Sequence, residues 1–234
     1  YPGASGDMRA TIALTEPSAG SDLRAIRATA LPENNGDFIL DGTKIFITNG
    51  LRAKLHLVLA KMPSNSSDGP RLNLHIVEAN TPGVSVTRLF DKMGFKHVDT
   101  AELFFDQVRL SPDSVVGLEP GNGLSQILST LESGRLAMAG TAIGLARRAI
   151  SIALQYAKDR VAFGVPIAQH QAVQIHLANM ATQLIAARAL TREAVRQKNL
   201  RGRADMMASM AKLFASEAAM TITQEAMRVL GGYG

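Results

Sequence analysis

The chain has 234 residues and a mass of 24.9 kDa; 46% of its residues are hydrophobic and 19% are charged. This balance is typical of a globular protein with a sizeable core, and it excludes a disordered tail or a fibrous repeat. The sequence contains no cysteine, which excludes a disulfide framework, a thiolate zinc site and a cysteine nucleophile. It contains no run of about 18 consecutive apolar residues, so we expect no membrane span.

The net charge of +5 is concentrated in the second half of the chain. The net charge is −1 up to Val115 and +6 from Val116 onward. A basic half favours an anionic ligand, which is a nucleic acid, an anionic membrane surface or a phosphate-bearing cofactor. Charge alone does not choose among the three.

The first half of the sequence is typical of short strands separated by turns. Seven strands are expected, at residues 27–31, 37–40, 43–48, 55–59, 72–77, 84–89 and 101–105. The dipeptides Asn35-Gly36 and Asp41-Gly42 favour tight hairpin turns, so the first three strands are predicted to form a meander. Because no helix lies between the strands, the pattern predicts a small antiparallel sandwich or barrel.

The second half changes to helical spacing, with apolar residues at alternating steps of four and three. The first such stripe comprises Leu124, Leu128, Leu131, Arg135, Met138, Ala142, Leu145, Ala149, Ile152 and Tyr156. Two more run from Val173 to Ala194 and from Ala211 to Val229. They predict most of an antiparallel, up-down helical bundle. The expected fold class is therefore α+β, with a β domain over residues 1–116 and an incomplete helical domain over residues 117–234. A single mixed domain is less favoured because the two patterns do not interleave.

Residues 15–22 follow an apolar strand and combine hydroxyl side chains, small residues and a glycine. Such a loop exposes backbone N–H groups and hydroxyl donors, which suit a phosphate or the edge of a flavin. An ordinary connection between strands is the alternative. Further along, Phe46 and Thr48 are two residues apart, so a regular strand would place ring and hydroxyl on one face, ready for a planar ligand. Here the alternative is a core Phe and a strand-ending Thr.

Two arginines occupy distinctive helical positions. Arg135 replaces an expected Leu on the first stripe, and a charge there must be paired or must face a ligand. Arg160 lies near a helix end, where favourable interaction with the helix dipole also explains it. The five histidines have no metal-ligand spacing, so we interpret them as structural and expect no metal site.

Four motifs together resemble the acyl-CoA dehydrogenase family of flavoenzymes. Residues 14–22 resemble the first family signature, and residues 42–50 are similar to the strand that lies along the flavin. Residues 160–164 followed by Gln171 resemble the Arg-x-x-Phe-Gly…Gln segment. Residues 230–234 match the glycine segment that precedes the catalytic C-terminal part. The motifs occur in the family's order, and the likeness covers essentially the whole chain.

The resemblance implies that FAD binds between the β domain and the helices, with the Thr48 hydroxyl near flavin N5. The residues that it implies at the cofactor are Ile12, Leu14, Thr15, Ser21, Phe46, Ile47, Thr48, Arg160, Phe163, Gln171, Arg228, Val229, Leu230, Gly231 and Gly232. Those from Arg160 onward would reach the FAD of a neighbouring subunit. The residues that it implies at the CoA moiety are Ser21, Glu132, Ser133, Gly134 and Arg135.

The implied reaction oxidises the Cα–Cβ bond of an acyl-CoA thioester to a 2-enoyl-CoA, as in fatty acid β-oxidation. A carboxylate takes the α-proton while the β-hydride passes to the flavin. The electrons then leave to an electron-transferring flavoprotein. The resemblance also implies a homotetramer, in the bacterial cytoplasm or the mitochondrial matrix.

The catalytic base is expected outside this sequence. The chain begins with Tyr1 and stops on a glycine cluster, so we expect a piece of a longer polypeptide. Most family members carry the base as a Glu after that cluster, here after Gly234. The minority position directly before the helix arginine is Gly134 here, and Glu132, two residues earlier, is not assigned as the base. We therefore expect the chain as given to be inactive.

Three further classes remain open, and one of them, a purely structural interaction module, predicts no yellow colour in the purified protein. An acyl-CoA oxidase or a nitroalkane-type flavoenzyme would share these motifs and differ in how the reduced flavin is reoxidised. A DNA-associated member of the same fold would use the basic half for phosphate contacts. The absence of tryptophan and of basic clusters interleaved with aromatic residues counts against nucleic acid.

Overall fold

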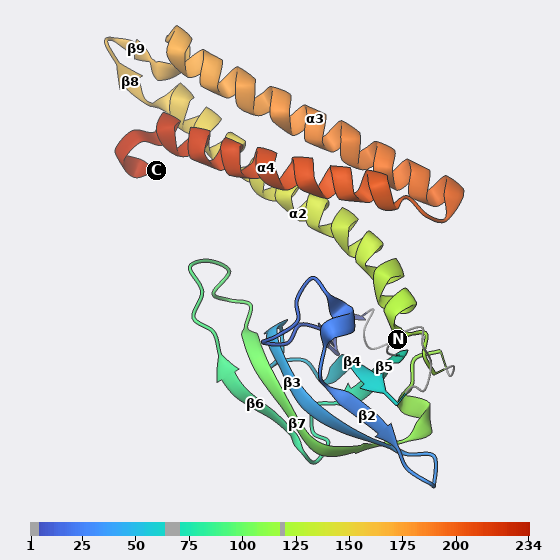
Figure 1. Cartoon of the computed structure of the whole chain (residues 1–234). Helices are drawn as coiled ribbons and strands as arrows, with labels where there is room; N and C mark the ends of the chain where they lie inside the picture. The colour runs from blue at the N-terminus through green and yellow to red at the C-terminus, as the bar shows by residue number, and fades with distance from the viewer. Residues whose placement is uncertain (1–4, 64–70, 118–119) are drawn as a thin grey trace. The chain divides into compact units, whose positions relative to one another are not determined.

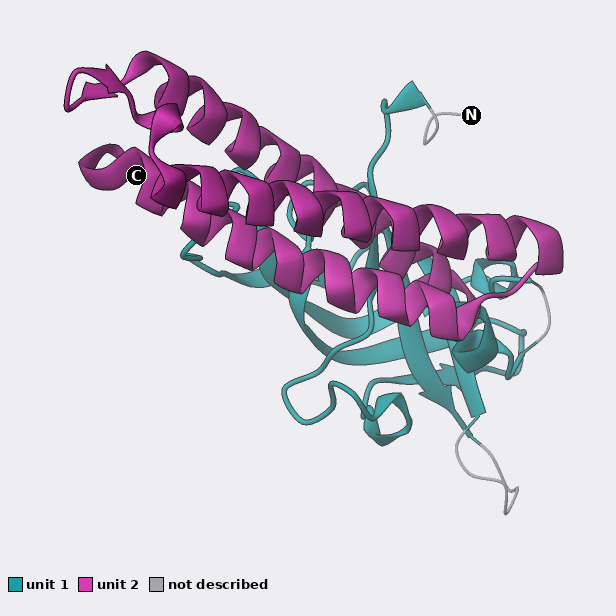
Figure 2. Cartoon of the chain, turned by 90° about the horizontal axis from the view of Figure 1, so that it is seen from above, with its two compact units in different colours: residues 1–127 teal, residues 128–234 magenta. Residues whose placement is uncertain are grey.

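The computed structural model describes residues 5–63, 71–117 and 120–234. The chain forms two compact units, Tyr1–Ile127 and Leu128–Gly234 (Figure 2). The first holds the sheet and the second holds three helices. The domain boundary at residue 116 stays a prediction.

In its described residues, the sheet unit contains seven paired strands in the order β1-β4-β2-β3-β7-β6, with β5 paired to β4 (Figure 1). The strands are β1 (Ala10–Ala13), β2 (Thr29–Pro32), β3 (Phe38–Thr48), β4 (Leu55–Met62), β5 (Arg71–Glu78), β6 (Val84–Leu89) and β7 (Thr100–Leu110). Strands β1 and β2 run parallel to β4, whereas the other pairs are antiparallel. The α+β class is confirmed, but the sheet is mixed rather than antiparallel, and it is not a closed barrel.

The predicted meander is wrong at Asp41-Gly42. The turn at Asn35-Gly36 does join β2 to β3, but β3 then continues through Gly42 as one strand of 11 residues. The register against β7 shifts between Leu40 and Gly42, where Asp41 of β3 faces both Asp106 and Gln107, so the bulged strand is β7. Gly42 has a φ of +140°, and a Cβ there would lie 2.6 Å from Cβ of Ala28. A close approach of two strands and a tight turn both favour glycine, so the dipeptide alone does not distinguish them.

The core of the sheet unit is built from inward-facing aliphatic and aromatic side chains. Its buried members are Ala13, Ala30, Phe38, Leu40, Ile47, Val58, Ala60, Val77, Ala101, Leu103, Phe105, Val108, Leu110 and Val115. Two histidines, His56 and His75, are buried as well. Nδ1 of His75 lies 3.0 Å from the hydroxyl of Ser114, and its ring packs edge-on against Phe38.

The helical unit confirms the up-down arrangement of three helices, α2 (Gly123–Asp159), α3 (Gln171–Arg201) and α4 (Asp205–Leu230). α3 and α4 lie side by side along their length, and Gly202 ends α3 in the left-handed conformation. The buried face of each helix is dominated by alanine. The buried residues are Ala139, Ala146, Ala153, Ala157, Met180, Ala187, Ala194, Ala211, Ala215, Ala218, Ala219, Ile222, Ala226 and Val229.

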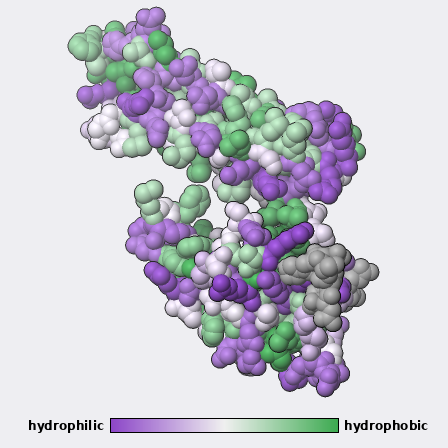
Figure 3. All heavy atoms as spheres, in the orientation of Figure 1, coloured by the Kyte–Doolittle hydropathy of each residue, from purple (hydrophilic) through white to green (hydrophobic). Residues whose placement is uncertain are grey.

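The stripe predicted for α2 is only partly correct, because Ala142 and Ala149 pack against the core but its larger members do not. The face that enters the core is displaced by one residue and repeats every seven residues at Ala139, Ala146 and Ala153. On the predicted stripe, Met138 is 56% exposed and Leu145 is 50% exposed. Figure 3 shows hydrophobic residues (green) on the surface among hydrophilic ones (purple), and exposed apolar side chains contribute to them. The helix therefore has two apolar faces, of which the small-residue face packs.

By length and composition alone, α2 is long and apolar enough to cross a membrane, although the sequence has no uninterrupted apolar run of that length. A helix in the core of a packed protein passes the same test. Here the alanine face of α2 contributes to the core of the helical unit.

Candidate functional site

The loop at residues 15–22 lies alongside β3 in the sheet unit. The carbonyl of Thr15 accepts a hydrogen bond from the backbone N–H of Ile45 at 2.8 Å. On the preceding strand, the hydroxyl of Thr11 donates to the carbonyl of Thr48 at 2.6 Å. The two segments that sequence analysis selected separately therefore form one continuous surface.

Exposure separates the side chains of this surface into two groups. Phe46 is 59% exposed and Ile12 is 38% exposed, and Thr48 and Ser21 are exposed too. The alternative of a core Phe at position 46 is therefore wrong. By contrast, Ile47 is only 3% exposed and belongs to the core of the sheet, so it offers a ligand little beyond its backbone.

A bulge in β3 itself overturns the strand geometry expected at Phe46. The register against β7 shifts between Lys44 and Ile47, and Phe46 has a φ of +60°. Strict alternation would put Lys44 and Phe46 on the same face. Instead Lys44 is fully buried and Phe46 is exposed, and the Phe46 ring packs 4.9 Å from the ring of Phe90. Phe46 and Thr48 are both exposed, but not for the reason that period-two spacing gave.

A buried ion pair that the sequence did not predict lies beneath this surface. Nζ of Lys44 lies 2.8 Å from Oε1 of Glu16, and the two side chains are 0% and 3% exposed. A signal was present, since Glu16 lies within the selected loop and Lys44 within the selected strand motif. What the spacing did not show was that their side chains meet.

The surface of the sheet unit fits one edge of a flavin. An exposed aromatic ring and an aliphatic side chain, Phe46 and Ile12, supply apolar area for a planar ring system. The exposed hydroxyls of Thr48 and Ser21 supply hydrogen-bond partners for its polar atoms. At Gly20, no atom lies within 4 Å of where a Cβ would be, so a ligand has room there.

At one end of the helical unit, a tight hairpin joins α2 to α3. It pairs β8 (Val161–Ala162) with β9 (Val165–Pro166), and Phe163 and Gly164 at its tip have φ values of +55° and +79°. This conformation makes Phe163 96% exposed, with His170 packed edge-on against it. Arg160 before the hairpin and Gln171 after it are also exposed.

The end of α4 lies beside this hairpin end. The ring of Tyr156 in α2 lies 6.1 Å from the ring of Tyr233, just beyond α4. Arg228 is exposed and paired with Glu225, which also contacts His176 of α3.

The glycine segment that follows α4 is open. No atom lies within 4 Å of where a Cβ would be on Gly231 or Gly232, whereas Val229 before them is 7% exposed and Leu230 is half-buried. The bare backbone, together with the exposed side chains of Arg160, Gln171 and Arg228, fits an anionic group such as a pyrophosphate. Val229 packs in the core instead, so its side chain does not face that group.

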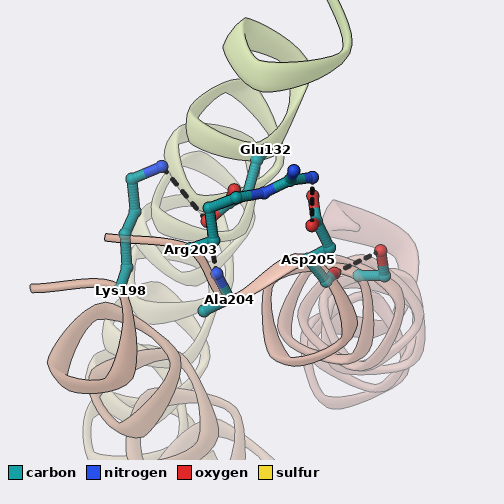
Figure 4. A network of polar contacts seen from close by, with 6 residues as sticks. Glu132, Lys198, Arg203, Ala204 and Asp205 are labelled. Carbon is teal, nitrogen blue, oxygen red and sulfur yellow. Dashed lines mark hydrogen bonds and ion pairs between the residues drawn. The ribbon is translucent and has the colours of Figure 1, made fainter. Parts of the chain in front are cut away.

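The segment that sequence analysis assigned to CoA lies near the opposite end of the helical unit. Glu132 is 1% exposed, and its Oε1 accepts from the backbone N–H of Ala204 at 2.8 Å and from Nζ of Lys198 at 3.2 Å (Figure 4). A nearby pair, Arg203 with Asp205, lies in the same connection between α3 and α4. The Glu132 carboxylate is therefore engaged inside the unit.

The other members of that segment are more accessible. Ser133 and Gly134 are exposed and Arg135 is half-buried, and the structure describes no ion pair for Arg135. Along α2, Arg135 and Asp159 are about 36 Å apart at 1.5 Å per residue. The two ends of the helical unit are therefore too far apart for one small ligand to contact both. Among the described residues, no group of three or more His, Asp or Glu is placed to hold a metal ion.

Comparison with known proteins is decisive for the family. Residues 11–108 match the middle domain of acyl-CoA dehydrogenases, and residues 121–234 match their C-terminal domain. The chain belongs to the acyl-CoA dehydrogenase family. Together these two matches cover most of the chain, and they follow the order that the four motifs indicated.

Comparison with individual proteins gives the same family. The chain is 41% identical to an acyl-CoA dehydrogenase of Bacillus subtilis over 99% of its own length and 60% of the relative's. It superposes on butyryl-CoA dehydrogenase from Megasphaera elsdenii with a TM-score of 0.94 and 36% identity, over 99% of this chain and 60% of that one. A glutaryl-CoA dehydrogenase from Mycobacterium smegmatis in complex with FADH2 gives a TM-score of 0.90 and 32% identity, over 99% and 57%. The chain thus spans about 60% of the length of these relatives.

Proposed function

We propose that the protein containing this chain is an FAD-dependent acyl-CoA dehydrogenase that oxidises the Cα–Cβ bond of an acyl-CoA thioester. The observation that carries the proposal is the single surface formed by the loop at residues 15–22 and the end of β3, where Phe46 and Thr48 are exposed together. Family membership and the FADH2 complex of a relative support the choice of cofactor. The butyryl-CoA dehydrogenase relative supports a short acyl chain.

On this proposal, FAD supplies the acceptor for the substrate β-hydride. Phe46 and Ile12 give the ring system its apolar contact, and the Thr48 hydroxyl donates a hydrogen bond to its N5 edge. Because these groups are fixed by a sheet, they need no reorganisation during the reaction. Ser21 and the segment Ser133 to Arg135 contact the CoA moiety, where the Arg135 guanidinium pairs with an anionic group.

The hairpin end of the helical unit is proposed to serve the cofactor of a neighbouring subunit. Arg160, Phe163, Gln171, Arg228 and the backbone of residues 230–232 are the groups involved. The separation of about 36 Å along α2 supports this division, since one flavin site does not reach both ends. The proposed assembly is a homotetramer that passes electrons to an electron-transferring flavoprotein.

The catalytic base is proposed to lie outside these 234 residues. Position 134 is a glycine, and the Glu132 carboxylate is buried against Lys198 and Ala204. A base that takes the α-proton must be within hydrogen-bond reach of it, which this burial does not allow.

The decisive experiment uses the whole protein in which this chain occurs. We expect the purified protein to show flavin absorbance bands, and anaerobic addition of butyryl-CoA to bleach them. Glu132→Gln should still be bleached. A colourless protein that takes up no FAD would overturn the proposal, and loss of bleaching in a folded Glu132→Gln variant would show that Glu132 is the base. Rapid reoxidation by oxygen after bleaching would indicate an oxidase.

A further inference from the structure

The buried ion pair between Glu16 and Lys44 joins the two halves of the proposed flavin surface. Glu16 belongs to the loop, and Lys44 lies immediately before the bulge of β3. Both are almost fully enclosed, so neither side chain contacts a ligand directly. A buried pair is costly unless further hydrogen bonds complete it, and here they do.

Glu16 is held on several sides. Its Oε2 accepts from the backbone N–H of Arg27 at 2.5 Å, and its Oε1 accepts from that of Ala28 at 3.0 Å and from Lys44. Its own backbone exchanges two hydrogen bonds with Ala19, which closes the tip of the loop. One carboxylate therefore fixes the loop to the segment before β2 and to β3.

Lys44 completes the clamp from the strand. Its Nζ donates to the carbonyl of Leu14 at 3.1 Å as well as to Glu16. Burial lowers the pKa of the Lys44 ammonium, and its contact with Glu16 opposes that effect. At the next residue, the N–H of Ile45 donates to the carbonyl of Thr15, within the two-residue bulge of β3. Pairing with β7 resumes at Ile47, so the bulge occurs where β3 also contacts the loop.

We propose that Glu16 and Lys44 are positioning residues for the flavin: the pair holds the loop at residues 15–21 against the bulged end of β3, so that Thr15, Phe46 and Thr48 form one binding surface. This inference rests on the proposed function, because it assigns a purpose to a device beneath that site. Without the pair, Ile45 loses its partner in the loop, and the bulge that exposes Phe46 relaxes.

The test compares FAD affinity in folded variants of the whole apoprotein. Lys44→Met keeps an unbranched side chain as far as Cε and removes the charged Nζ. Glu16→Asp keeps both charges but shortens the side chain by one methylene. This variant still tests the inference if Lys44→Met does not fold. Glu33→Gln is the matched control, because it removes the carboxylate of the more exposed pair with Arg109 in the same unit.

We expect the FAD dissociation constant to rise at least tenfold in Lys44→Met and Glu16→Asp, and by less than twofold in Glu33→Gln. Amide hydrogen exchange should accelerate at Ile45, Arg27 and Ala28 in the first two variants without FAD. A purely structural role would lower the melting temperature while folded molecules kept wild-type affinity, and that result would overturn the inference. A wild-type protein that binds no FAD would instead overturn the proposed function, and the inference with it.

Discussion

The carboxylate of Glu132 in α2 accepts a hydrogen bond from the backbone N–H of Ala204 at 2.8 Å, 72 residues later in the chain. Ala204 directly precedes α4, so the bond satisfies a backbone donor at the start of that helix. Lys198, near the end of α3, shares the same oxygen. One buried side chain thereby links all three helices.

Replacing Glu132 should destabilise the helical unit. Glu132→Gln keeps the size but removes the charge that Lys198 faces, and we expect a loss of about 1–3 kcal/mol. Urea unfolding followed by circular dichroism at 222 nm measures it. Glu193→Gln is the control, because Glu193 pairs with Arg196 on the surface of α3, and it should leave the urea midpoint almost unchanged. Equal midpoints for the two variants would contradict the role assigned to Glu132.

The Thr48 hydroxyl should matter more for flavin reduction than for flavin binding. Losing one hydrogen bond costs about 1–2 kcal/mol, so Thr48→Ala should slow reduction by saturating butyryl-CoA about five- to thirtyfold. Stopped-flow absorbance in the whole protein gives this rate. Thr87→Ala on β6, whose hydroxyl bonds to Glu102, is the control and should reduce at the wild-type rate. An unchanged rate of flavin reduction in Thr48→Ala would show that the Thr48 hydroxyl does not assist reduction at N5.

The sheet unit should lose stability in mild acid because of His75. Burial lowers the pKa of His75 from 6.5 to about 4, so the ring is neutral in the folded state. Between these values the unfolded chain binds more protons than the folded one. Above pH 6.5, His75 therefore does not reduce the free energy of unfolding. As the pH drops from 6.5 towards 4, the free energy of unfolding falls by about 3 kcal/mol in all.

Urea unfolding between pH 7 and pH 4 tests this slope. His75→Gln keeps a polar partner for Ser114 and removes the titration, so its stability should depend less on pH than that of the wild type. His97→Gln is the control, because His97 is exposed, and it should retain the wild-type slope. The prediction fails if the His75→Gln curve parallels the wild type.

The alanine face of α3 should not accept a larger side chain. Ala187 is 2% exposed and lies in the core of the helical unit, whereas the adjacent Ala186 is exposed. Ala187→Leu should cost about 1–3 kcal/mol through overpacking, and Ala186→Leu should cost almost nothing. Thermal unfolding of the two variants, compared with the wild type, measures the difference. Similar melting temperatures for the two variants would contradict the prediction, because they would mean that the core accommodates a larger side chain at position 187.

Local sequence signals predicted most of the elements but not their long-range partners. The hairpin turn at Asn35-Gly36 and the buried stripes of α3 and α4 were predicted correctly, because each depends on neighbouring residues. The strand break at Asp41-Gly42 was wrong, since Ala28 and β7 decide that position. The parallel pairing of β1 with β4 joins segments about 45 residues apart and leaves no local signal.

The error in α2 has a different cause. Hydrophobic size favours the stripe with Met138 and Leu145, but helices that approach closely select small residues. The candidate site shows the same limit. Thr48 is exposed, as its predicted place beside a ligand requires, but its role stays a prediction. Period-two spacing gave no hint that a bulge would separate the buried Lys44 from the exposed Phe46.

The alanine faces also determine how the helical unit responds to heat. A methyl side chain loses no rotamer entropy when it is buried, and it removes little apolar surface from water. The heat capacity of unfolding follows that apolar surface, with about 12–15 cal/mol/K per residue as the usual value. Residues such as Ala139, Ala187 and Ala215 are typical of the core of the helical unit. The heat capacity of unfolding of this unit should therefore lie below that range. Its stability curve is then shallow, and the free energy of unfolding changes little between cold and warm conditions.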